Sequence, residues 1–142
     1  MTEYLSIDKN KRLGITEKIK EIFLAEKGVV FAYVFGSFLD LPSFRDIDIG
    51  IYLDSIKKEE IDNFEMKLSG KISKKCEMPF DIFEVKVLNF APNSFLNNIF
   101  RNGKLLFSHN EKLLSDLIEK TSLEAIDNEY FAHQSLKELI PA

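Results

Sequence analysis

Two aspartates spaced two residues apart are the first residues of this chain that suggest chemistry. Asp46 and Asp48 belong to the segment 46–53 (DIDIGIYL), in which isoleucines alternate with other residues. This alternation predicts a strand with both carboxylates on one face and the isoleucines on the other. A third carboxylate, Asp81, stands near the start of another predicted strand, 80–88 (FDIFEVKVL). If the two strands are neighbours, the three carboxylates converge.

Such a group of like charges is costly unless a cation neutralises it. Carboxylate oxygens suit hard divalent cations such as Mg²⁺, which also bind phosphate oxygens. Two such ions about 4 Å apart assist in-line displacement at phosphorus. The three aspartates therefore point to a metal site for phosphoryl chemistry.

A Gly-Ser pair, Gly36-Ser37, directly follows the apolar segment 29–35 (VVFAYVF). That segment reads as a strand buried on both faces. Glycine lets backbone N–H groups approach a phosphate closely, and the serine hydroxyl adds a donor. Each feature is common by itself. The order of strand, Gly-Ser turn, Asp-x-Asp strand and later Asp is far more specific, and it is typical of a site for a metal-bound nucleotide.

The elements that must position these residues predict one domain of the α/β (α+β) class, a small mixed sheet flanked by helices. Thr16 is the expected cap of a helix that runs to about Lys27. Residues 36–45 are expected to form a loop or short turn. Further helices are expected over 55–75, 93–103, 111–120 and 123–140, and an edge strand over 105–107.

Composition sets wider limits. The chain has 142 residues, 45% of them hydrophobic, and a formal net charge of −4. This size fits one domain, and the mild acidity argues against a protein that holds nucleic acid mainly by charge. The single cysteine, Cys76, cannot form an internal disulfide, which favours a reducing compartment, the cytoplasm. We see no apolar run long enough to serve as a signal peptide or to span a membrane, so no membrane contact is expected.

The segment VFGSFLDLPSFRDIDIGIYL resembles the signature of the polymerase-β-like nucleotidyltransferase superfamily. FDIFEV is similar to the strand that carries that superfamily's third carboxylate. NFAPNSFLNNIFRNGKLLF resembles the end of the minimal nucleotidyltransferase (MNT) domain. The resemblance covers a nucleotidyltransferase core over about 15–107, within a single domain of 1–142, and a C-terminal helical tail over about 111–142 follows it.

This resemblance implies an activity and a partner. MNT proteins are often antitoxins of HEPN-domain ribonuclease toxins, and characterised members transfer AMP from ATP to a toxin tyrosine. The implied function is therefore that of a Mg²⁺-dependent protein adenylyltransferase. Gly36 and Ser37 would hold the triphosphate of ATP, and Arg45 would neutralise charge on the nucleotide, although a plain surface role for Arg45 is equally compatible with the sequence.

The resemblance also assigns the carboxylates. Asp46 and Asp48 would coordinate two Mg²⁺ ions, and Asp81 would hold the catalytic ion and help to deprotonate the acceptor hydroxyl. The loop between Ser37 and Asp46 differs from the common family pattern, because it lacks the Arg and Gly that often follow Gly-Ser.

Two other functions remain open at this point. The same fold could adenylylate a small molecule such as an aminoglycoside, or the protein could neutralise its partner by contact alone. The segment 123–140, with Tyr130, Phe131, Leu136 and Ile140, is a candidate for docking a partner protein. Oligomerisation is possible, and direct nucleic-acid binding is not expected.

Overall fold

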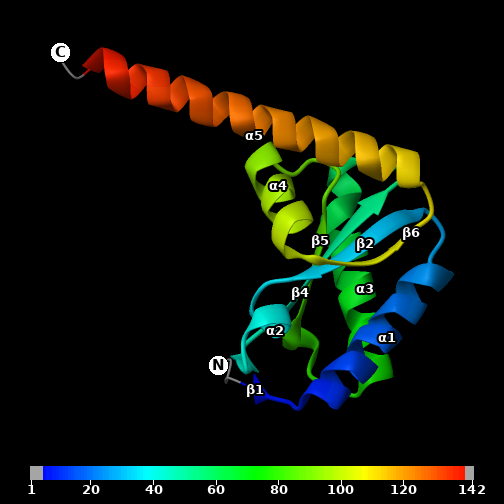
Figure 1. The fold of residues 1–142 in the computed structure, drawn as a ribbon. Helices are drawn as coiled ribbons and strands as arrows, with labels where there is room; N and C mark the ends of the chain where they lie inside the picture. The colour runs from blue at the N-terminus through cyan, green and yellow to red at the C-terminus, as the bar shows by residue number, and fades with distance from the viewer. Residues whose placement is uncertain (1–4, 140–142) are drawn as a thin grey trace.

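A four-stranded mixed sheet forms the centre of the molecule in the computed structural model, which describes residues 5–139 (Figure 1). Its strand order is β5-β4-β2-β6. The strands are β2 (Val29–Phe35), β4 (Ile47–Leu53), β5 (Phe83–Val87) and β6 (Lys104–Ser108). β4 and β5 run parallel, whereas β2 is antiparallel to both β4 and β6. The expected class, a small mixed sheet with flanking helices, is confirmed.

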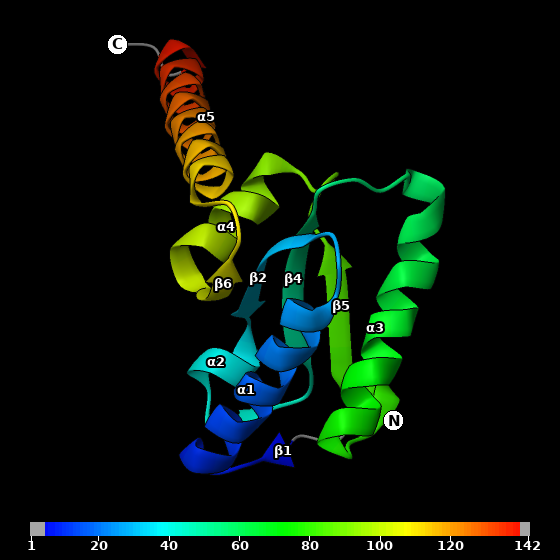
Figure 2. The same ribbon diagram turned by 90° about the vertical axis from the view of Figure 1, so that its right-hand side faces the viewer.

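Helices cover both faces of the sheet (Figure 2). On one face lie α1 (Lys9–Ala25) and α3 (Ile61–Cys76), and on the other lie α4 (Asn93–Asn102) and α5 (Glu111–Leu139). Two apolar clusters follow from this arrangement, one on each side of the sheet. In the part of the chain that the structure describes, no helix is both long and apolar enough to cross a membrane.

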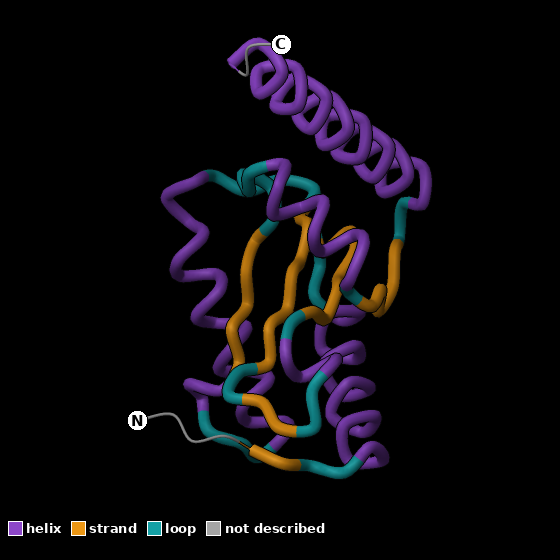
Figure 3. Tube along the Cα trace, turned by 60° about the vertical axis from the view of Figure 1, so that its left-hand side comes forward, coloured by secondary structure: helices purple, strands orange, loops and turns teal. Residues whose placement is uncertain are grey.

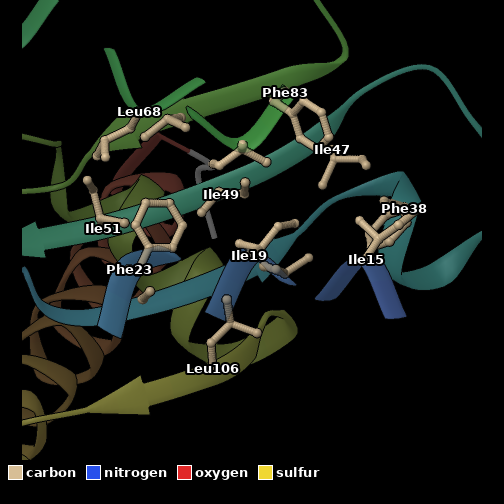
Figure 4. Packing of buried hydrophobic residues seen from close by; sticks show 14 of the residues in the cluster. Ile15, Ile19, Phe23, Phe38, Ile47, Ile49, Ile51, Leu68, Phe83 and Leu106 are labelled. Atoms are coloured by element: carbon tan, nitrogen blue, oxygen red, sulfur yellow. The ribbon is translucent and has the colours of Figure 1, made fainter. Parts of the chain in front are cut away.

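The alternation in β4 decides which face carries chemistry. Ile47, Ile49 and Ile51 are completely buried in the cluster beneath α1 and α3 (Figure 4). Since successive strand residues point to opposite faces, Asp48 and Tyr52 face the α4 and α5 side. Tyr52 packs in the second cluster, stacked on Phe31 with ring centroids 5.2 Å apart. Asp48 stands at the other end of the strand, beyond this packed region.

The first helix begins earlier than the sequence predicts. Asp8 is its cap, because the Asp8 side chain accepts a hydrogen bond from the backbone N–H of Lys11. Thr16 lies inside the helix, where its hydroxyl donates to the carbonyl of Arg12 at 2.8 Å. The prediction of Thr16 as the cap is wrong, since the polar first two turns of the helix carry little of the apolar spacing that signals a helix.

The segment 36–45 is more ordered than a loop. It contains a short helix, α2 (Ser37–Asp40), and a two-residue strand, β3 (Ser43–Phe44). β3 pairs antiparallel with β1 (Leu5–Ser6), and Figure 3 shows this pair apart from the main sheet. Residues that precede α1 therefore help to fix the connection between β2 and β4.

Two short 3-10 helices lie where the sequence predicts the beginning of a longer helix and of a longer strand. The first, η1 (Lys58–Glu60), precedes α3, so the α-helix starts at Ile61 rather than near Ser55. The second, η2 (Phe80–Ile82), precedes β5, so the strand starts at Phe83.

The C-terminal region forms one continuous helix, α5, where the sequence predicts two. At the predicted boundary between them, the Thr121 side chain is buried and its hydroxyl donates to the carbonyl of Ile118, so the helix continues. The second half of α5 extends beyond the sheet (Figure 1). The apolar side chains proposed for docking (Tyr130, Phe131, Leu136 and Ile140) lie outside the residues whose side chains the structure describes.

Candidate active site

The candidate site lies where β4 and β5 begin, on the sheet face that also carries α4. The two strands are parallel neighbours in which Asp48 pairs with Glu84 and Gly50 pairs with Lys86. Paired residues of neighbouring strands point to the same face, so Glu84 and Lys86 share the face of Asp48. Asp46 directly precedes β4 and is half-buried.

Asp81 is not in the strand beside Asp48. It lies in η2, and its side chain is exposed. The expectation that Asp81 stands in β5 is therefore wrong, and Glu84 occupies the position opposite Asp48 instead. The sequence does carry a signal for this, because Glu84 and Lys86 alternate with the buried Phe83, Val85 and Val87.

The carboxylates perturb one another strongly. Burial is the main reason that the pKa of Asp48 rises to about 7, and a side-chain hydrogen bond with Glu84 adds to the rise. The negative charges of Glu84 and Asp46 raise this pKa further, while Lys86 opposes them. The pKa of Asp46 is also raised, mainly by burial and then by Glu84, with Arg45 opposing and Asp81 a smaller contributor. The site thus holds more negative charge than its own cations neutralise.

The donor set suits a metal ion that arrives with a phosphate ligand. Within residues 5–139, no group of three or more Asp, Glu, His or Cys side chains is arranged to hold a metal ion without other ligands. Mg²⁺ in nucleotide enzymes is typically bound by one or two carboxylates together with substrate phosphates and water, rather than by an all-protein cage. Asp46 and Asp48, with Glu84 beside them, supply oxygen ligands of that kind.

Gly36 places the phosphate-binding turn against these carboxylates. Its φ angle is +82°, a conformation that glycine adopts far more readily than other residues. A Cβ atom built on Gly36 would overlap Oδ2 of Asp48 and would lie 3.3 Å from its Cγ. Only glycine therefore fits here without a shift of Asp48. Ser37 follows directly as the first residue of α2, and its side chain is half-buried.

The opposite side of Asp48 is apolar. Phe35 pairs with Asp48 across β2 and β4, and its ring meets that of Phe95 from α4 edge-to-face, with centroids 5.7 Å apart. Both rings are half-buried. Asp48 is thus flanked by an acidic strand, β5, on one side and by an aromatic wall on the other.

Arg45 is a cation that lies next to this acidic group. The residue is exposed and directly precedes Asp46. Its charge lowers the pKa of Asp46 against the effect of burial. The structure therefore brings Gly36, Ser37, Arg45, Asp46 and Asp48 together and adds Glu84 and Lys86, while Asp81 lies in η2, near enough for its charge to raise the pKa of Asp46.

Comparison with known proteins identifies the family. The model of the family described as polymerase beta, nucleotidyltransferase matches residues 17–112, which is more than half of the chain. This protein therefore belongs to the polymerase beta nucleotidyltransferase family. No curated protein sequence matches the chain.

Several solved structures that match the chain are toxin–antitoxin complexes. A chain of the complex between a tri-AMPylated HEPN toxin of Shewanella oneidensis and its MNT antitoxin matches with a TM-score of 0.64 and 14% identity, over 92% of this chain and 99% of that one. A chain of the toxin–antitoxin MntA-HepT matches with a TM-score of 0.59 and 13% identity, over 94% and 100%. A toxin–antitoxin structure with AMP-PNP matches with a TM-score of 0.59 and 14% identity, over 95% and 100%.

Proposed function

We propose that this protein transfers AMP from ATP to a hydroxyl group of a partner protein, a HEPN-type toxin, and so acts as its antitoxin. Membership of the nucleotidyltransferase family supports the reaction class. Similarity along nearly the whole chain to the MNT antitoxin complex with an AMPylated toxin supports the acceptor. The single cysteine and the proposed partner agree with a reducing, cytoplasmic setting.

The observation that carries this proposal is the meeting of three elements at one point. Asp48 on β4 faces Glu84 on β5, and the same Asp48 carboxylate lies against Gly36 at the end of β2. A triphosphate seated on the turn at Gly36 and Ser37 therefore lies beside the carboxylates. In this arrangement Asp46 and Asp48 would hold Mg²⁺, which would bind the triphosphate oxygens and stabilise the charge that develops during transfer.

The reaction at this site is a displacement at the α-phosphorus of ATP. The acceptor oxygen forms a bond to that phosphorus, and the bond to the bridging oxygen of the β-phosphate breaks, so that pyrophosphate leaves. The proton of the acceptor hydroxyl passes to a carboxylate. Glu84 is suited to accept it because its side chain is exposed and lies next to Asp48.

The chemistry left to the protein is mainly positioning and charge stabilisation. The turn at Gly36 and Ser37 orients the triphosphate, and Arg45 adds positive charge beside Asp46. Lys86, on the same face as Asp48, is the cation that offsets the negative charge there.

The test is transfer of labelled AMP from ATP to the purified partner in the presence of Mg²⁺. We expect Asp48→Asn to lower the rate about 100-fold or more, since it removes a charged group from the reacting centre. Asp54→Asn is the matched control, because Asp54 is an exposed carboxylate just beyond the other end of β4. Full transfer by Asp48→Asn would overturn the proposed site.

A second pair of variants assigns the third carboxylate. We expect Glu84→Gln to lose most of the transfer rate and Asp81→Asn to keep most of it, because Glu84 alone of the two lies in β5 opposite Asp48. The reverse result would restore Asp81 to that role. If Asp48→Asn neutralises the toxin without labelling it, the protein acts by contact rather than by modification.

A further inference from the structure

Arg12, near the start of α1, donates hydrogen bonds from its guanidinium group to backbone carbonyls of the connection between β2 and β4. Its Nε donates to the carbonyl of Ile7 at 2.9 Å. Its Nη1 donates to the carbonyls of Phe38 and Leu41 at 2.8 and 2.6 Å, and its Nη2 donates to the carbonyl of Pro42. Three of these four acceptors belong to the segment 36–45, which joins the phosphate-binding turn to Asp46.

These carbonyls need an outside donor because of the local sequence. In a continuing α-helix, the Phe38 carbonyl would accept from the N–H of the residue four positions later. That residue is Pro42, which has no N–H. The guanidinium supplies the missing donor to Phe38 and also donates to the carbonyls of Leu41 and Pro42 at the end of the turn.

Packing fixes the guanidinium in place. Its Cζ lies 4.9 Å from the ring centroid of Phe44 and 5.6 Å from that of Phe38. The two rings meet edge-to-face with centroids 4.9 Å apart, and both side chains are buried. The guanidinium of Arg12 is therefore held against the segment 36–45, and Ser37 lies near the start of that segment.

We propose that Arg12 is a positioning residue that shapes the segment 36–45 for nucleotide binding before ATP arrives; this inference rests on the proposed function. The segment has Gly36 and Ser37 at one end and Asp46 directly after the other, so its shape sets the distance between the triphosphate donors and the first metal-binding carboxylate. If Arg12 did not hold it, the segment would have to become ordered on each binding event, which weakens binding.

The geometry requires arginine in particular. The planar guanidinium offers five N–H donors in a fixed fork and can reach several carbonyls at once. The lysine ammonium is one nitrogen on a flexible stem and cannot span acceptors on residues 7, 38 and 42. Arg12→Lys should therefore restore the positive charge and part of the packing, but only part of the hydrogen bonding.

The experiment compares Arg12→Gln, Arg12→Lys and the control Lys11→Gln in steady-state AMP transfer with varied MgATP. Lys11 is an exposed cation on the same turn of α1. We expect Arg12→Gln to raise the KM for MgATP about tenfold with kcat within about twofold of the wild type, and Arg12→Lys to lie between the two. Lys11→Gln should match the wild type.

A second readout does not depend on activity. The backbone N–H groups of Leu39 and Leu41 donate to the carbonyls of Gly36 and Ser37 across the turn that contains α2, so their hydrogen exchange reports the order of this segment. Arg12→Gln should speed the exchange of these two amides, whereas the amides of β4 should keep their rates. This measurement needs no AMP transfer, so it tests the ordering of the segment by Arg12 separately from the proposed function.

Two results would overturn the inference. One is a loss of kcat in Arg12→Gln that follows the folded fraction, with the KM for MgATP unchanged, because that is the result of a merely structural role. The other is unchanged exchange at Leu39 and Leu41 in a folded Arg12→Gln variant.

Discussion

The contact between Gly36 and Asp48 leads to a specific prediction about the free energy of unfolding. Gly36→Ala forces a residue with a Cβ into the backbone conformation of Gly36, φ +82° and ψ −162°, which costs about 1–3 kcal/mol. The new Cβ would also overlap Oδ2 of Asp48, and overpacking of this kind typically costs about 1–3 kcal/mol more. We expect Gly36→Ala to lower the free energy of unfolding by about 4 kcal/mol in total and to abolish AMP transfer.

A double-mutant cycle separates the two contributions. In an Asp48→Ala background the carboxylate is absent, and the new Cβ at position 36 meets the Cβ of residue 48 at an ordinary 3.6 Å. The cost of Gly36→Ala should then fall to the backbone contribution, about 1–3 kcal/mol. The coupling between the two positions is the part of the cost that comes from the overlap.

Gly14→Ala is the matched control. Gly14 lies within α1, and a Cβ built there has nothing within 4 Å. The change should stabilise the protein by about 0.5–1 kcal/mol because alanine favours a helix interior over glycine. Urea unfolding followed by circular dichroism measures all four variants, since the chain has no tryptophan for fluorescence. Equal costs of Gly36→Ala with and without the Asp48 carboxylate would refute the predicted overlap.

Two further predictions concern the scaffold. Glu26 accepts hydrogen bonds from Lys71 at 2.9 Å and Lys67 at 3.3 Å, and these bonds lower its pKa. The Glu26 carboxylate therefore stabilises the fold at pH values above the ordinary carboxyl pKa. This stabilisation is lost as the pH falls through the pKa that Glu26 has in the folded state. Glu26→Gln should cost about 0.5–1 kcal/mol at neutral pH and nothing in strong acid, and an equal cost at both would contradict this account. Asn89 pairs with both backbone groups of Leu53, at 2.9 and 2.7 Å. Asn89→Ala should cost about 1–2 kcal/mol in chemical unfolding, and an unchanged unfolding midpoint would contradict the role of this pair.

The central strands could be predicted from the sequence because their patterns have one interpretation. The segment 29–35 is continuously apolar, and β2 has these bounds. The isoleucines of β4 alternate strictly, which placed Asp48 on the correct face. These two strands also carry Gly36 and Asp48 at their ends, so the heart of the candidate site followed from local pattern alone.

Positions that depend on turns and tertiary contacts could not be predicted in the same way. Asp81 precedes β5 in a 3-10 turn, and nothing local shows that the strand starts at Phe83. Asp48 lies opposite Glu84 because of the register between the parallel strands β4 and β5, and this register is set by the packing of distant segments. The role of Arg12 is likewise invisible locally, because its acceptors Phe38 and Leu41 lie far along the chain.

The most direct test of the account is the intact mass of the proposed HEPN partner after co-expression with this protein. The account predicts that the partner gains the mass of one or more adenylate groups with the wild type and gains none with Asp48→Asn, while Asp54→Asn behaves as the wild type. An unmodified partner with the wild-type protein, or a modified partner with Asp48→Asn, would contradict it.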